Sequence, residues 1–180
     1  MPWILSGAGN SFIVEVLEDG DKLPTVESVQ KFCRSHNVDG YLALVKSDSA
    51  NKSFDWAFFN RDGSEAEFCG NAARCAQYFI FHTLNATKAE HRTLSGQVKT
   101  WTENERHWVQ MPKAEIFQES VLLQIDEASH EGFWCDTGVP HVVIFEKPGP
   151  LDKELSRRIR FHPKLGPRGA NVTWVQGGIA

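Results

Sequence analysis

Residues 60–75 read NRDGSEAEFCGNAARC, a polar turn that runs into the start of a helix. Asn71 is a residue type that caps helices, and apolar residues then recur at helical spacing. We therefore predict a helix that begins at Asn71, directly after Cys69 and Gly70. The residues expected to share its apolar face are Ala72, Cys75, Tyr78, Phe79 and His82.

Cys69 stands immediately before this helix and is the candidate catalytic residue. The first N–H groups of a helix have no internal partner, and the helix dipole adds roughly +0.5 charge at that end, so a thiolate is favoured there. Gly70 allows backbone N–H groups to approach an anion, so we expect a substrate carboxylate at the same helix end. A thiolate beside a carboxylate suits proton abstraction better than nucleophilic attack.

The other three cysteines are interpreted as structural. Cys75 falls on the expected apolar face, and Cys33 and Cys135 have neither a glycine turn nor a helix start beside them. Five residues separate Cys69 from Cys75, which is too many for the usual paired metal ligands, and no histidine pair follows. We predict no metal site. His141 stays open between a polar site residue and a hydrogen-bonded histidine at a strand entrance.

Short apolar and β-branched runs bounded by turns predict strands along the rest of the chain. Many short strands with two or three helices favour an α+β fold over a parallel βαβ sheet. A polar stretch after a strand pair, at 112–120, predicts a boundary between domains 1–115 and 116–180. The expected strands are 11–17, 41–45, 54–60, 97–101, 107–111, 122–125, 132–135, 142–145 and 172–175, and the further helices are 26–36 and 152–159.

Composition excludes several classes of protein. The 180 residues include 19 Lys and Arg against 23 Asp and Glu, for a net charge of −4, which gives no general drive towards nucleic acid or an anionic membrane. The apolar runs are far shorter than the ~20 residues that cross a bilayer. Four cysteines are too few for a disulfide scaffold, and the N-terminus has no secretory pattern. We therefore expect a cytoplasmic protein.

One stretch of the chain is echoed in outline by another. Residues 7–14 and 137–144 both place a glycine turn before a β-branched strand, about 130 residues apart. Turns followed by strands are common, so the echo on its own is a weak indication of a duplicated architecture.

The ordered set of motifs resembles the diaminopimelate epimerase family of cofactor-independent amino-acid racemases. The segment around Cys69 is the specific one, and the others gain weight from their order along the whole chain. The matching pieces are Gly7-Ala8-Gly9-Asn10-Ser11-Phe12, Val38-Asp39-Gly40, Phe59-Asn60-Arg61-Asp62-Gly63-Ser64, Cys69-Gly70-Asn71-Ala72-Ala73-Arg74-Cys75, Gly138-Val139-Pro140-His141, Arg160-Phe161-His162-Pro163 and Gly169-Ala170-Asn171-Val172.

This resemblance implies two similar α+β halves, each with strands wrapped around a central helix and with substrate in the cleft between them. It implies an isomerase that interconverts LL- and meso-diaminopimelate, towards lysine and peptidoglycan, without a cofactor. The partner is then a small-molecule amino acid, and a homodimer is expected. Cys69 matches the first of two catalytic cysteines on opposite faces of the α-carbon. The matching substrate-binding positions are Asn10, Asn60, Gly70, Asn71 and Asn171.

The chain departs from the family pattern at three positions and in one larger respect. Ala72 replaces a glycine, Val139 an asparagine and Gly40 a glutamine. The interval from Gly9 to Cys69, repeated in the second half, places a second cysteine near roughly position 198, whereas the chain ends at Ala180. These features imply a C-terminally truncated epimerase with an incomplete second half.

We expect such a chain to be inactive alone, and either marginally stable or self-associating, because strands without their central helix expose apolar surface. Two alternatives stay open. One is a racemase of the same fold for another amino acid, favoured by Val139 and Gly40. The other is a module that binds an amino acid without turning it over.

Overall fold

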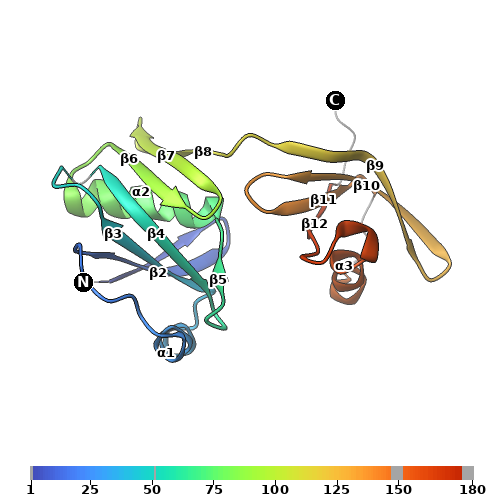
Figure 1. Cartoon of the computed structure of the whole chain (residues 1–180), viewed down its shortest axis with the longest axis horizontal. Coiled ribbons are helices and arrows are strands. Elements are labelled where there is room, and N and C mark those ends of the chain that lie inside the picture. The colour runs from blue at the N-terminus through green and yellow to red at the C-terminus, as the bar shows by residue number, and fades with distance from the viewer. Residues whose placement is uncertain (1, 51, 147–151, 176–180) are drawn as a thin grey trace. The chain divides into compact units, whose positions relative to one another are not determined.

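The computed structural model describes all residues except 1, 51, 147–151 and 176–180 (Figure 1). The chain divides into two compact units, Met1–Pro112 and Lys113–Ala180. Each unit has its own sheet and its own buried core. No helix in the described part of the chain is long and apolar enough to span a membrane.

The first unit is a mixed sheet with two helices. Eight strands of described residues form the sheet, in the order β1-β2-β3-β4-β6-β7-β8, with β5 beside β4. The helices are α1 (Val26–His36) and α2 (Gly70–Leu84). The strands are β1 (Trp3–Gly7), β2 (Asn10–Leu17), β3 (Gly40–Lys46), β4 (Ser53–Asn60), β5 (Glu65–Ala66), β6 (Lys88–Thr93), β7 (Gly96–Glu103) and β8 (Arg106–Gln110).

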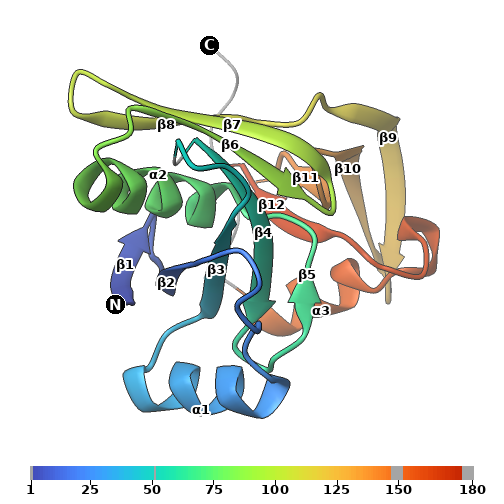
Figure 2. The same cartoon turned by 60° about the vertical axis from the view of Figure 1, so that its left-hand side comes forward.

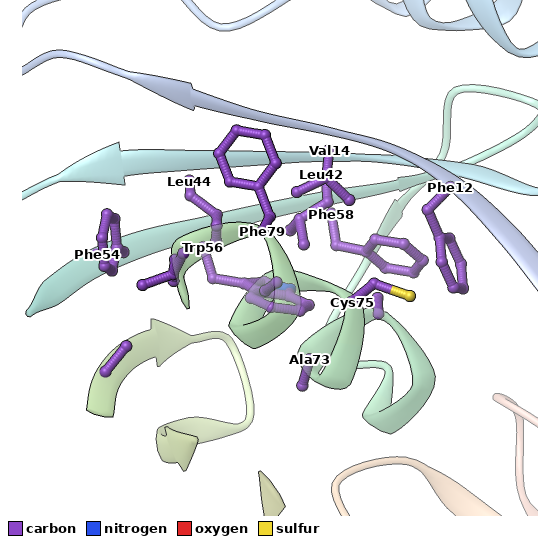
Figure 3. Packing of buried hydrophobic residues seen from close by; sticks show 14 of the residues in the cluster. Phe12, Val14, Leu42, Leu44, Phe54, Trp56, Phe58, Ala73, Cys75 and Phe79 are labelled. Carbon is purple, nitrogen blue, oxygen red and sulfur yellow. The ribbon is translucent and has the colours of Figure 1, made fainter. Parts of the chain in front are cut away.

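Helix α2 lies against one face of this sheet and α1 against the other (Figures 1 and 2). Side chains alternate between the two faces of a strand, so in β2 Phe12 and Val14 pack towards α2 while Ile13 packs towards α1. Figure 3 shows Phe12, Val14 and Phe79 within the larger core, beside α2. Small residues of α2, such as Ala72 and Ala76, are fully buried and allow the helix to pack closely.

The second unit is a smaller sheet with one α-helix. Its strands run in the order β12-β11-β10-β9, and they are β9 (Glu115–Ile125), β10 (Ala128–Asp136), β11 (Pro140–Ile144) and β12 (Asn171–Trp174). Helix α3 (Lys153–Arg160) contributes Ile159 to the core of this unit, and the 3-10 helix η1 (Pro163–Leu165) contributes Leu165. Asp152 caps α3 by accepting from two backbone N–H groups, both at 2.9 Å.

The two units repeat one arrangement of strands. In the first, β1 and β2 form an antiparallel hairpin, and β3 returns parallel to β2 after α1. In the second, β10 and β11 form the hairpin, and β12 returns parallel to β11 after α3. A glycine with positive φ, Gly9 at +89° or Gly138 at +107°, stands in each hairpin turn. The α+β class and the duplicated architecture are therefore confirmed.

The predicted helix at 26–36 and most of the predicted strands are found within a few residues of their expected bounds. One prediction about α2 is wrong: its N-cap is Cys69 and not Asn71, because Cys69 has extended φ and ψ of −145° and 113° and the helix begins at Gly70. Its apolar face is also narrower than predicted. Tyr78 is 37% exposed and His82 is exposed, and their rings pack against each other 4.3 Å apart.

The turn between β1 and β2 leads to a stability prediction. Gly9 has φ of +89°, and a Cβ built there would have no heavy atom within 4 Å. Gly9→Ala should therefore lower the free energy of unfolding by about 1 kcal/mol through backbone strain alone. Ala8, with φ of 51°, offers the reverse change, and Ala8→Gly should not destabilise. Urea midpoints measured by tryptophan fluorescence test both, and equal losses in the two variants would contradict this account.

Candidate functional site

Cys69 lies at the start of α2 with its side chain partly exposed. Its carbonyl oxygen accepts the N–H of Ala73 at 2.9 Å, which closes the first helical turn. Its side chain makes no capping hydrogen bond, unlike the Ser, Thr, Asp or Asn that usually caps a helix. The cap side chain therefore leaves the first backbone N–H groups of α2 to another acceptor, and such groups bind anions.

Two asparagines predicted for the site are joined directly. Asn71, in the first turn of α2, donates its Nδ2 to Oδ1 of Asn10 at 2.9 Å, across 61 residues of sequence. Arg74, one turn further along the helix, donates Nη2 to Oδ1 of Asn71 at 2.8 Å. Asn10 begins β2 and is exposed. The fold thus brings Asn10 and Asn71 together beside the start of α2, where Cys69 and Gly70 also lie.

Asn60, another predicted site residue, is held by its own turn at the end of β4. Its Nδ2 donates to Oγ of Ser64 at 3.0 Å, and its backbone N–H donates to the Ser64 carbonyl at 2.9 Å. Ser64 in turn donates its backbone N–H and its hydroxyl to Asp62, and these bonds lower the pKa of the Asp62 carboxyl. The hydrogen bonds of Asn60 are therefore local and separate from the Asn10–Asn71 pair.

Asn171 lies in the second unit, at the start of β12. Its Oδ1 accepts from Nη1 of Arg160 at 2.6 Å, and its backbone lies opposite His141 of β11. His141 is half-buried, and burial lowers its pKa while the Asp136 charge raises it. Asn171 is therefore described within its own unit, beside the histidine whose role the sequence left open.

The three departures from the family pattern have clear local settings. Ala72 is fully buried inside α2, so its backbone is helical and a residue with a Cβ is tolerated, as predicted. A Cβ at Gly40 would lie 2.8 Å from the carbonyl oxygen of Phe59, so a side chain there requires β3 or β4 to shift. Val139 lies in the turn before β11 and accepts a bond from the Thr137 N–H at 3.2 Å.

The remaining cysteines are buried, which confirms their structural interpretation. Cys75 is 4% exposed within the core (Figure 3), and burial raises its pKa to about 11, with a smaller opposing effect from Arg74. Burial likewise raises the pKa of Cys33 and Cys135. Among the residues that the structure describes, no group of three or more His, Cys, Asp or Glu side chains is arranged to hold a metal ion.

Arg74 is the site residue that the sequence analysis missed. It also lies in the wall of a cleft of about 630 Å³ between the β1–β2 turn, α2 and β8. Its position three residues after Asn71 places both side chains on one helix face, which is the signal that could have identified it. The cleft is lined by Leu5, Ser6, Gly7, Ala8, Arg74, Cys75, Tyr78, Arg106, His107, Trp108 and Val109.

Comparisons with known proteins agree with one another. Residues 3–117 match the family model described as diaminopimelate epimerase. The chain is 32% identical to the diaminopimelate epimerase of Hydrogenobaculum sp., over 94% of this chain and 67% of that protein. It is 34% identical to the Aquifex aeolicus enzyme (97% and 68%) and 36% identical to that of Chlamydia trachomatis (96% and 62%). The chain thus spans between 62% and 68% of the length of these relatives.

Solved structures agree in fold. A predicted epimerase from Pseudomonas aeruginosa has a TM-score of 0.58 at 14% identity, covering 97% of this chain and 69% of that one. A probable proline racemase from Agrobacterium radiobacter has a TM-score of 0.59 at 10% identity, covering 81% and 52%. At these identities the likeness establishes a shared fold and no more.

Proposed function

The chain belongs to the diaminopimelate epimerase family, and on that premise we propose that it is an isomerase that interconverts LL- and meso-2,6-diaminopimelate by moving a proton at the α-carbon. The observation that carries the proposal is the place of Cys69, a partly exposed thiol at the start of α2, beside the Asn10–Asn71 pair. The proposal includes the expectations of the resemblance, which are a reaction without a cofactor, a role towards lysine and peptidoglycan, a homodimer and a cytoplasmic location.

In the proposed step the Cys69 thiolate takes the α-proton. The C–H bond breaks, an S–H bond forms, and the electron pair left on the α-carbon is delocalised into the substrate carboxylate. The free N–H groups at the start of α2 stabilise the negative charge that develops on that carboxylate. Return of a proton from the same sulfur restores the original configuration, so inversion needs a second acid on the opposite face.

Within these 180 residues Cys69 is the cysteine suited to this role, since Cys33, Cys75 and Cys135 are buried. We therefore propose that the 180-residue chain exchanges the α-proton without inverting the centre. Incubation with LL-diaminopimelate in D₂O tests this, with mass spectrometry to count deuterium and chiral chromatography to separate isomers. Deuterium in recovered LL-isomer is the expected result. Absence of exchange would contradict the proposed function, and formation of the meso isomer would contradict the assignment of a single acid.

A second candidate is a racemase of this fold for another amino acid, and Gly40 is the observation that favours it. A side chain at position 40 would collide with the carbonyl oxygen of Phe59, so the contact expected there from the family pattern is absent. Exchange rates measured in parallel for diaminopimelate, glutamate and proline separate the two. A module that only binds would hold one of these amino acids and exchange none.

A further inference from the structure

Arg74 determines how the Asn10–Asn71 pair is oriented. A guanidinium group can only donate hydrogen bonds, so the Asn71 atom 2.8 Å from Arg74 Nη2 must be the oxygen. The amide nitrogen of Asn71 therefore faces Asn10, and the Asn10 atom that accepts from it at 2.9 Å must also be the oxygen. Amide orientations are usually ambiguous, and here a residue that only donates removes the ambiguity for both side chains.

This chain of bonds fixes what Asn10 offers to its surroundings. Its oxygen is engaged by Asn71, so its amide nitrogen, with two N–H donors, is the part of the amide outside the pair. Asn10 is exposed, at the start of β2. The first N–H groups of α2 are donors as well. Both features therefore favour an acceptor such as a carboxylate, and both disfavour an ammonium group.

We propose that Arg74 is a positioning residue that sets the donor polarity of the site: through Asn71 it keeps the amide nitrogen of Asn10 free for a substrate carboxylate. The inference rests on the proposed function for the identity of the substrate. Without the guanidinium, Asn71 can rotate its amide by half a turn, and Asn10 can then rotate in response. The Asn10 oxygen would face the carboxylate in part of the population, and binding would weaken before chemistry is affected.

The test compares three variants of the 180-residue chain. Arg74→Met keeps the apolar stem and removes the donor, whereas Arg74→Lys keeps a group that only donates. Arg106 is the matched control, because it lines the same cleft on β8 but takes no part in the asparagine pair. For α-proton exchange of diaminopimelate in D₂O, we expect Arg74→Met to raise KM about tenfold and to change kcat less than about threefold. Arg74→Lys should restore KM, and Arg106→Met should leave both constants unchanged.

The outcomes separate this inference from the function on which it rests. If the parent chain exchanges no deuterium, the proposed function fails. If the parent exchanges and Arg74→Met has an unchanged KM, or if Arg74→Lys does not restore it, Arg74 has no positioning role. Thermal unfolding of each variant is recorded first, and Arg74→Gln is measured beside Arg74→Met so that the result does not depend on one variant folding. A fall in kcat alone would also overturn the inference.

Discussion

Cys69→Ser should lower the rate of α-proton exchange by a factor of about 10² to 10⁴, the usual contribution of a positioned acid–base group. A serine hydroxyl is close in size to the thiol but is a far weaker acid, so the variant keeps the geometry at the start of α2 and loses the base. The measurement is deuterium at the α-carbon of diaminopimelate, recorded by mass spectrometry over time in D₂O. Substrate affinity should change little, because the asparagine pair and the helix N–H groups remain.

The matched control for this variant lies on the same helix. Cys75 is buried, and burial raises its pKa to about 11, so it is a poor proton acceptor at neutral pH. Cys75→Ala should lower stability through the small cavity it leaves and keep the exchange rate within about threefold of the parent. Loss of exchange in Cys75→Ala, or normal exchange in Cys69→Ser, would assign the chemistry to the wrong sulfur.

The parts of the fold that sequence could predict are those in which local pattern and tertiary packing agree. Val26–His36 forms the expected helix, because Val29 and Cys33 are buried together four residues apart. The strand that carries Phe12 and Val14 was expected because β-branched and apolar residues fit a strand buried on both faces. The start of α2 was placed within two residues, which sufficed to bring Cys69 to a helix N-terminus.

What sequence could not predict depends on contacts between distant residues. Strand β6 (Lys88–Thr93) is mostly polar, and only Ala89 and His91 are buried, so it has little apolar signal. The bond between Asn10 and Asn71 joins two turns 61 residues apart, and its direction depends on Arg74. Composition and spacing contain neither the pairing nor its polarity, because both arise only when the β1–β2 turn meets the start of α2.

The largest expected effect on stability also comes from such a contact. His91 is fully buried under α2 in the first unit, between the rings of Phe54 and Trp56. Its Nε2 lies 2.9 Å from the hydroxyl of Thr100, which donates its own proton to Oε1 of Gln77 at 2.7 Å. His91 must therefore donate from Nε2, and its Nδ1 is a buried acceptor with no hydrogen-bond partner. Burial accordingly lowers the pKa of His91 to about 4.

Stability should therefore fall as the solution is acidified through the range between pH 6.5 and about 4. Below pH 6.5 the unfolded chain binds a proton at His91 that the folded chain refuses, so the linkage favours unfolding increasingly as the pH falls. Between about pH 7.5 and about pH 4.5 the loss from this group is roughly 2 to 3 kcal/mol. Urea unfolding at the two pH values measures it.

His91→Phe isolates this contribution, because phenylalanine keeps an aromatic ring between Phe54 and Trp56 and cannot be protonated. The variant loses the bond to Thr100, which costs about 1 kcal/mol at neutral pH. Its further loss on acidification should nevertheless be smaller than that of the parent by roughly 2 to 3 kcal/mol. His36→Gln removes an exposed imidazole from α1 and should follow the parent curve. If His91→Phe and the parent lose equal stability on acidification, the buried imidazole is protonated in the folded protein without penalty, and the tautomer assigned through Thr100 and Gln77 is wrong.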